Sequence, residues 1–276
     1  MRQVEQLIDA IRGPDGGRGR GVLPDASDAT PDQLYRELIN GVGTSPVGRL
    51  AIGRAWILVR SATNAGLAFA PRWPAGVTPA RLERLDGVML RDLATLALRR
   101  DELAAAIGVA AINAHYNRPD LLGSDDDGLS PGSAADVGAD PTGGPTVVIG
   151  RFPGLDDKLP GALVIERNPG PRDLPEAAAE RVLPGARRVI ITASTLANHS
   201  LPRLLALARR AEISLIGPGT PLAPCLFTHG IAVLAGFVLD QPDPAADAVA
   251  AGAGYGRLRA FGRRLTLRRT APARSP

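Results

Sequence analysis

Small hydroxyl and amide side chains follow a short apolar run in the second half of the chain. The run covers residues 189–191, and Thr192, Ser194, Thr195 and Asn198 come soon after it. Side chains of this kind cap the helix that follows, and they can also bind a carboxylate or phosphate at its N-terminus. We therefore predict that these four residues bind a ligand, with helix capping alone as the alternative.

A second apolar run, residues 213–216, ends in a rigid loop with the sequence Gly-Pro-Gly-Thr-Pro at 217–221. Runs of branched apolar residues are typical of strands buried in a parallel sheet. Two such strands, each followed by small polar residues, indicate the carboxyl edge of an α/β sheet, where ligands bind. We place Gly217, Thr220 and Pro221 in the same ligand site. The alternative is a loop that only turns the chain.

Two further polar residues stand at positions that favour a ligand role. Glu166 ends the apolar run 162–165, and an acid there commonly accepts hydrogen bonds from the ribose hydroxyls of a nucleotide or of S-adenosylmethionine. Asn113 lies in an apolar helical stretch, where a buried amide without partners is costly. Asn113 either reaches a ligand or ties the helix to a loop of its own domain. Glu166 either binds the ligand or is a plain surface acid.

The loop at 150–154 reads Gly-Arg-Phe-Pro-Gly and does not match the G-x-G-x-x-G motif of dinucleotide-binding proteins. Pro153 removes one backbone donor and Phe152 adds bulk, so a pyrophosphate cradle is not expected. The sequence contains no G-x-S-x-G elbow for a serine nucleophile. We therefore assign no catalytic residue and leave open whether the protein is an enzyme.

The residues that commonly bind metals are few and scattered. His115, His199 and His229 share no metal-ligand spacing, and Cys225 is the one cysteine. A tight zinc or thiolate site is therefore not predicted. The acidic run at 125–127 is expected to be solvated. If a metal takes part, we expect it to arrive already chelated by a small molecule or to bind oxygen ligands.

Strands and helices alternate after residue 145, which favours a parallel, Rossmann-like sheet. The expected strands are 146–149, 162–165, 189–191, 213–216 and 230–238, and the expected helices are 176–182, 201–210 and 244–251. Residues 264–269 alternate apolar and polar side chains, so the C-terminal tail would add an edge strand.

The N-terminal third has an α+β pattern. We expect helices at 2–12, 31–39, 89–98 and 102–117, and a hairpin formed by 50–59 and 65–69. Asp101 is the expected N-cap of the last helix. Residues 121–144 are rich in Gly, Ser, Pro and Asp and indicate a linker. The predicted division is an α+β domain at 1–120, a flexible linker at 121–145, an α/β domain at 146–256 and a basic tail or edge strand at 257–276.

Charge and cysteine content narrow the class of protein. The chain has 276 residues and a net charge of +4, while residues 251–276 hold seven Arg and no acid, so the remainder carries 4 − 7 = −3. A tail of this kind makes nucleic-acid or acidic-partner binding a rival function, but aromatic residues are sparse there. With one cysteine, no membrane-spanning run and no signal peptide, we expect a cytoplasmic protein. A homo-oligomer is left open.

Several short segments, in order along the chain, resemble the putative heavy-metal chelation domain family. They are Ala-Ala-Ile-Asn-Ala (110–114), Val-Ile-Gly-Arg-Phe-Pro (148–153), Glu-Arg-Asn-Pro (166–169), Ile-Thr-Ala-Ser-Thr-Leu-Ala-Asn (191–198) and Gly-Pro-Gly-Thr-Pro-Leu-Ala-Pro (217–224), followed by Gly230 and Gly236. The chain departs from the family pattern at Arg151 and His199.

The resemblance implies an α/β protein in which an enolase-N-terminal-like domain precedes a Rossmann-like domain, with a ligand cleft between them. It also implies a role in making or handling pterin-, flavin- or siderophore-like metal chelators, by condensation, hydrolysis or group transfer. S-adenosylmethionine or a pterin- or flavin-like molecule is the implied cofactor or ligand. A metal-chelate carrier without turnover is the alternative.

Overall fold

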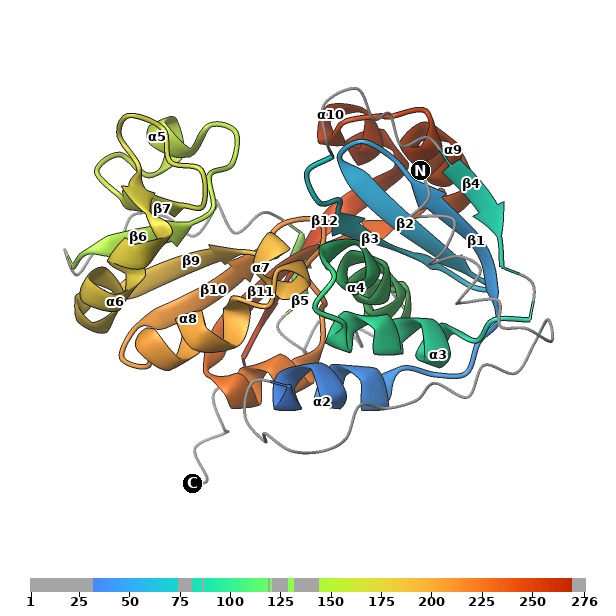
Figure 1. Ribbon diagram of the computed structural model, residues 1–276, viewed down its shortest axis with the longest axis horizontal. Helices are drawn as coiled ribbons and strands as arrows, with labels where there is room; N and C mark the ends of the chain where they lie inside the picture. The colour runs from blue at the N-terminus through green and yellow to red at the C-terminus, as the bar shows by residue number, and fades with distance from the viewer. Residues whose placement is uncertain are drawn as a thin grey trace.

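The computed structural model describes residues 32–73, 81–85, 87–118, 120, 129–131 and 144–269. The helix and loop expected before residue 31 lie outside these ranges. The described chain forms two sheets, with strand orders β3-β2-β1-β4 and β5-β12-β11-β10-β9-β6-β7-β8 (Figure 1). The first sheet is antiparallel and the second is mostly parallel. The predicted α/β fold is therefore confirmed.

The four-stranded sheet comes from the N-terminal part of the chain. Its strands are β1 (Val47–Ile52), β2 (Trp56–Ser61), β3 (Ala65–Phe69) and β4 (Arg81–Arg84). The expected single strand at 50–59 is wrong, because the chain turns between β1 and β2. Buried residues on both sides of that turn hide it from the apolar pattern. Gly53 fits there because a Cβ would overlap the Val249 carbonyl group.

Helices cover both faces of the four-stranded sheet. Helix α4 (Glu102–Tyr116) packs on β2 and β3, and α9 (Pro242–Ala250) and the short α10 (Tyr255–Leu258) lie over the other face. As predicted, Asp101 caps α4, with its carboxylate accepting a hydrogen bond of 2.8 Å from the Ala104 N–H. Gly66 on β3 allows α4 to approach closely, since a Cβ there would overlap the helix backbone.

Six consecutive strands of the larger sheet run parallel. They are β6 (Thr146–Ile149), β7 (Leu163–Glu166), β8 (Leu174–Pro175), β9 (Arg188–Thr192), β10 (Glu212–Ile216) and β11 (Ile231–Leu239). Their spatial order, β8-β7-β6-β9-β10-β11, is the 3-2-1-4-5-6 order of doubly wound α/β sheets. The chain therefore reverses its direction of winding between β6 and β9.

Two antiparallel strands complete the larger sheet. Strand β12 (Gly262–Arg268) pairs with β11, and β5 (Leu129–Pro131) pairs with the far side of β12. The tail therefore forms a strand, but β12 is not the edge. Residues 129–131 were expected within the linker, and that part of the prediction is wrong. Their Leu-Ser-Pro sequence is too short to give an alternating pattern.

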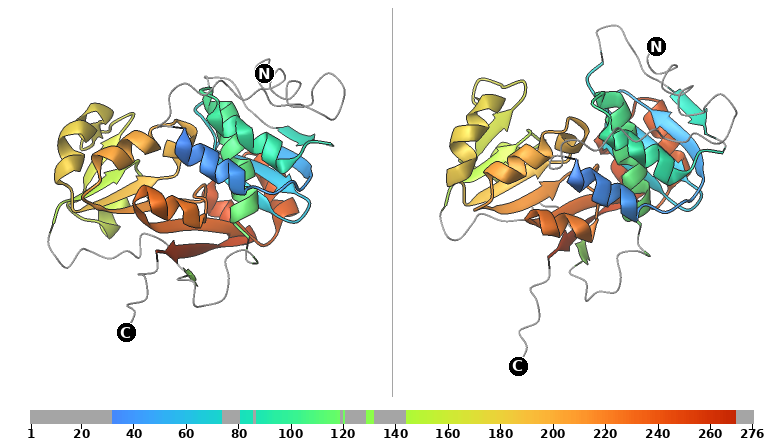
Figure 2. Two further views of the ribbon diagram at one scale, coloured as in Figure 1. Left: turned by 90° about the horizontal axis from the view of Figure 1, so that it is seen from below. Right: turned by 60° about the horizontal axis from the view of Figure 1, so that its bottom comes forward.

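Short helices cover the parallel strands on both faces (Figure 2). Helix α5 (Leu155–Lys158) packs on one face, while α6 (Ala179–Val182) and α8 (Leu201–Leu207) pack on the other. One helical turn, α7 (Ser194–Ala197), forms directly after β9, where a loop was expected. The 3-10 helix η7 (Pro224–His229) leads into β11 and contacts α2 (Gln33–Gly41). Helix α3 (Leu90–Ala94) and the 3-10 turn η1 (Thr95–Leu98) precede α4.

One hydrophobic core extends through both sheets. The same cluster contains Leu50 and Ile107 from the N-terminal part and Val189 and Leu215 from the larger sheet. The two sheets therefore pack as one body, and the domain limits drawn from the sequence stay a prediction. Within the described ranges, no helix is both long enough and apolar enough to span a membrane.

Candidate functional site

The candidate site lies at the carboxyl ends of β6 and β9. These two strands pair with each other, but the connections that follow them run to opposite sides of the larger sheet. After β6 the chain turns to β7 on one side, and after β9 it turns to β10 on the other. Gly150 follows β6 with φ +88, and a Cβ there would overlap the Thr192 hydroxyl at the end of β9. Gly150 and Thr192 therefore touch at the switch point, the place where ligands of doubly wound sheets bind.

Half-buried polar groups surround this switch point. Thr192, Ser194 and Gly217, three of the predicted residues, are partly exposed. The hydroxyl oxygens of Thr192 and Ser194 are 3.1 Å apart and share a hydrogen bond. Gly217 (φ +118) follows β10 and approaches Ala193. The structure thus brings the two predicted loops together, with hydroxyl groups that can donate to or accept from a ligand.

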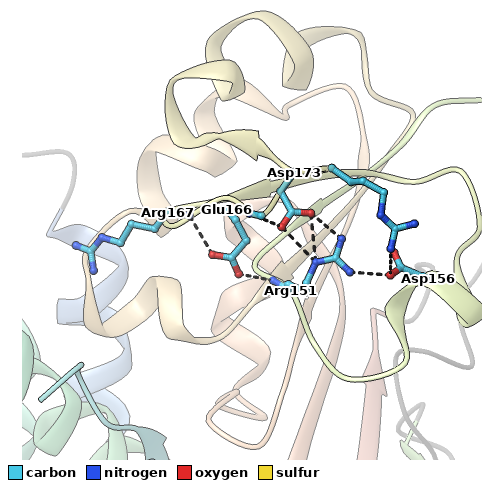
Figure 3. A network of polar contacts seen from close by, with 7 residues as sticks. Arg151, Asp156, Glu166, Arg167 and Asp173 are labelled. Carbon is cyan, nitrogen blue, oxygen red and sulfur yellow. Dashed lines mark hydrogen bonds and ion pairs between the residues drawn. The ribbon is translucent and has the colours of Figure 1, made fainter. Parts of the chain in front are cut away.

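Glu166 ends β7 at the same carboxyl edge of the sheet and is half-buried. Its carboxylate accepts hydrogen bonds from two main-chain N–H groups, Arg151 at 2.6 Å and Arg167 at 3.0 Å. Figure 3 shows the carboxylate held between these two loops. The predicted position of Glu166 at the carboxyl edge is confirmed. Each carboxylate oxygen retains a lone pair for another donor.

The side chain of Arg151 joins the loop after β6 to the loop after β7. Its guanidinium group lies 2.6 Å from Asp173 and 3.0 Å from Asp156 (Figure 3). The Asp173 side chain is only 5% exposed, and its hydrogen bond with Arg151 lowers the pKa of Asp173. An open hollow of about 550 Å³, lined by residues 151–157, lies beside this ion pair. Sequence reasoning missed the network because its partners lie 5 and 22 residues from Arg151.

Asn113 lies beneath the loop after β10 and not among the partly exposed residues of the site. Its side chain is fully buried, and Nδ2 donates to the carbonyl oxygens of Leu67 at 2.7 Å and Gly219 at 2.8 Å. Asn113 therefore connects α4 both to β3 and to the loop at 217–221. The alternative named from the sequence was a connection to a loop of its own domain, whereas the loop at 217–221 belongs to the larger sheet. In this arrangement no part of the amide is accessible to a ligand.

Asn117, one turn further along α4, has a matching role that sequence reasoning missed. Its Nδ2 donates to the Thr220 carbonyl at 2.9 Å, and its Oδ1 accepts from the Leu222 N–H at 2.9 Å. The spacing of four residues from Asn113, which places both on one helix face, was the available signal. The two amides fix the backbone of the loop from below.

Four other predicted ligand residues support the loops from within. Thr195, Thr220 and Pro221 are buried, and the Thr195 hydroxyl donates to the Thr192 carbonyl at 2.8 Å. The Asn198 side-chain oxygen accepts from the N–H and hydroxyl of Ser200 at 3.1 and 2.7 Å, which stabilises the turn before α8. Their placement at the carboxyl edge agrees with the prediction, but burial or capping occupies their side chains. Direct ligand contact by these residues stays a prediction.

His199 and Tyr35 hold α7 against the N-terminal part. His199 has a positive φ of 59, which is uncommon outside glycine. One ring nitrogen, Nε2, lies 2.8 Å from the Arg99 carbonyl, and burial lowers the pKa of His199. Its ring lies 4.8 Å from that of Tyr35. The Tyr35 hydroxyl donates to the Leu196 carbonyl at 2.8 Å, and burial raises the pKa of Tyr35.

An ion pair crosses from the first turn of α4 to the loop after β7. The Arg167 guanidinium lies 2.6 Å from the Glu102 carboxylate, and this hydrogen bond raises the pKa of Arg167. Both side chains are substantially exposed. The pair links the N-terminal part of the chain to the larger sheet beside Glu166.

The described residues do not offer a coordination sphere for a bare metal ion. Among them, no three His, Cys, Asp or Glu side chains come together as a metal-binding group. Burial raises the pKa of the Cys225 thiol, which disfavours the thiolate that binds soft metals. His229 lies 2.7 Å from the Glu37 carboxylate.

The chain is similar to two solved structures over most of its length. A crystal structure of a DUF364-family protein from Desulfitobacterium hafniense DCB-2 is 32% identical, with a TM-score of 0.74 over 87% of this chain and 98% of that one. The chain belongs to the DUF364 family. A second family structure, from Pyrococcus horikoshii, has a TM-score of 0.70 over 86% of this chain and 99% of that one, at 18% identity, and supports the fold alone.

Two family models match in order along the chain. Residues 35–116 match DUF4213 and residues 134–268 match DUF364, and both are described as putative heavy-metal chelation. No match was found among the curated proteins. The family description indicates a function related to metal chelates and a small-molecule or metal ligand.

Proposed function

We propose that this DUF364-family protein binds a small heterocyclic or metal-chelating metabolite at the switch point between β6 and β9. The observation that carries the proposal is the set of half-buried polar side chains at the carboxyl ends of parallel strands, beside the loop that begins at Gly217. Glu166 ends β7, Thr192 ends β9, and Ser194 follows β9. Such groups suit the hydroxyl, amine and ring nitrogen atoms of an organic ligand.

The roles of the residues follow from their exposure. Glu166 accepts hydrogen bonds from the ligand, and the hydroxyls of Thr192 and Ser194 donate or accept. Asn113 and Asn117 act beneath the site by fixing the loop at 217–221, and are positioning residues in this proposal. Thr195, Asn198, Thr220 and Pro221 support the same loops.

In this proposal any metal reaches the site already held by its chelator. This is favoured because the described residues bring together no group of three metal-binding side chains, whereas Glu166, Thr192 and Ser194 offer hydrogen-bonding groups that suit an organic molecule. The biological role would be metallophore or cofactor biosynthesis, by condensation, hydrolysis or group transfer, or heavy-metal handling. A chelate carrier without turnover is the second candidate, supported by the family description.

Native mass spectrometry with elemental analysis of the freshly purified protein tests the proposal. A bound organic mass is expected, and a metal near one equivalent would support chelate handling. S-adenosylmethionine, pterins and flavins are then screened by thermal shift, and each binder is incubated with the protein and analysed for conversion. Conversion identifies an enzyme, and binding without conversion identifies a carrier.

Two variants locate the site. Glu166→Gln is expected to weaken binding of the best ligand by about tenfold, equivalent to ~1.4 kcal/mol, since one charged acceptor is lost. Glu212→Gln is the matched control, because Glu212 is exposed at the opposite, amino end of β10. Equal affinities for the two variants and the unmodified protein would remove Glu166 from the site.

A further inference from the structure

The loop after β6 has few free backbone donors for a phosphate group. In nucleotide-binding α/β proteins, the main-chain N–H groups of this loop bind phosphate oxygens. Here Gly150 and Leu155 donate to main-chain carbonyls, at 3.0 and 3.3 Å, and Arg151 donates to Glu166. Pro153 has no N–H to donate. Four of the six positions from 150 to 155 therefore offer no free donor.

A carboxylate of the chain itself takes the place of an anionic ligand. The Glu166 carboxylate accepts hydrogen bonds from the main-chain N–H groups of Arg151, in the loop after β6, and Arg167, in the loop after β7 (Figure 3). A phosphate at this point would lie against the Glu166 carboxylate and repel it, or would have to displace it from both donors. A neutral or cationic group with N–H or O–H donors meets no such penalty.

The nearby guanidinium groups are also occupied. Arg151 binds Asp173 through Nε and Nη2 and Asp156 through Nη1, and the buried Asp173 side chain also accepts from the Gly170 N–H at 3.0 Å. The Arg167 side chain extends away from Glu166 (Figure 3), and its guanidinium group pairs with Glu102. Each guanidinium charge is therefore already matched by at least one carboxylate, as is that of Arg172, which lies 3.1 Å from Asp156, so a phosphate here would meet carboxylates as well as guanidinium groups.

We infer that the site selects a neutral or cationic heterocycle rich in hydrogen-bond donors and rejects the phosphate ester of the same molecule. The inference rests on the proposed function and specifies the ligand class of that same site. Glu166 binds donor groups of the ligand, and Thr192 and Ser194 bind its remaining polar edge. Dinucleotides and phosphorylated flavins are excluded, whereas nucleosides, pterins and unphosphorylated flavins remain.

Matched pairs of probes test the inference on the full-length protein. Riboflavin is compared with riboflavin 5′-phosphate, and adenosine with AMP, by isothermal titration at constant ionic strength. The unphosphorylated member of a binding pair is expected to bind at least about tenfold more tightly. Equal or tighter binding of the phosphate ester would overturn the inference while leaving the proposed function intact. Absence of binding by all four probes would count against both.

Two variants separate the cause from general loop damage. Glu166→Gln and Asp173→Asn each remove one internal anion, and the second frees part of the Arg151 guanidinium. Each is expected to narrow the preference for the unphosphorylated probe severalfold or more. In Glu166→Gln the unphosphorylated probe binds more weakly and the phosphate ester does not, whereas in Asp173→Asn the phosphate ester binds more tightly. Glu212→Gln should leave the ratio unchanged. A ratio that stays constant in both folded site variants would refute the role assigned to the internal carboxylates.

Discussion

Replacing Asn117 by alanine should destabilise the protein more than its single polar side chain suggests. The amide is fully buried and connects α4 to the chain on either side of Pro221. The change leaves the Leu222 N–H and the Thr220 carbonyl buried without these partners. Each orphaned group costs about 1–3 kcal/mol. The longer contact with the Phe237 carbonyl, at 3.3 Å, adds little. We expect a total loss of about 2–4 kcal/mol, below the additive maximum because the loop can relax.

Urea unfolding measures this loss as a shift in the midpoint at constant slope. The control is Asn168→Ala, at an exposed position, which should change stability by less than about 0.5 kcal/mol. Hydrogen exchange provides a local test, since the Leu222 amide should lose protection in Asn117→Ala and keep it in the control. A loss below about 1 kcal/mol, with Leu222 still protected, would refute the idea that Asn117 holds this loop.

Three further predictions concern the neighbourhood of the switch point. Gly150→Ala should lower the free energy of unfolding by about 2–4 kcal/mol in urea, because a positive φ and an overlap with Thr192 both oppose the methyl group. The control is Gly161→Ala, which has a similar φ of +83 and open space around it and should lose only about 1 kcal/mol. Equal losses in the two variants would contradict the overlap at Gly150. Tyr35→Phe should lose about 0.5–1.5 kcal/mol, because the Leu196 carbonyl loses its 2.8 Å hydrogen bond from the tyrosine hydroxyl but keeps main-chain donors such as the His199 N–H at 3.3 Å, and an unchanged unfolding midpoint would disprove this. Burial lowers the pKa of His199 in the folded protein. As the pH falls through about 6.5, the unfolded chain therefore binds a proton at this residue before the folded chain does, and the folded state loses stability. His199→Asn should therefore be relatively more stable at about pH 5.5 than at about pH 7.5, and an unchanged difference would refute the titration.

The parallel strands could be predicted from the sequence because each is a short run of branched apolar residues. Residues 146–149 form β6 as expected, and β9 and β10 extend the expected runs by one residue or so. What local pattern could not give is their order, since the neighbours of β6 depend on where the crossovers place β7 and β9. The switch point, and with it the meeting of Gly150 and Thr192, exists only in the assembled sheet.

The sequence predicted where the candidate site lies, but not which of its residues are exposed to a ligand and which support the loops from beneath. Because all three are polar, Asn113, Thr220 and Ser194 were predicted to bind the ligand together. In the structure Asn113 and Thr220 are buried and Ser194 is partly exposed, a difference that depends on tertiary packing. The partners of Asn113 are main-chain carbonyls, which every residue possesses and no sequence pattern marks. Asn117 was missed for the same reason.

The packing of α9 on the four-stranded sheet limits how the chain can be divided. A fragment ending near residue 120 would keep the strands but would lack the helix that covers one of their faces. That face includes Trp56, Leu58 and Leu67, which would be left in contact with water. Such a fragment is expected to aggregate when produced alone and to stay soluble when the C-terminal fragment is supplied with it. The segment that matches the first family model therefore depends on the second segment to cover its apolar sheet face. A gene that encoded the first segment alone would need another polypeptide to bury that face.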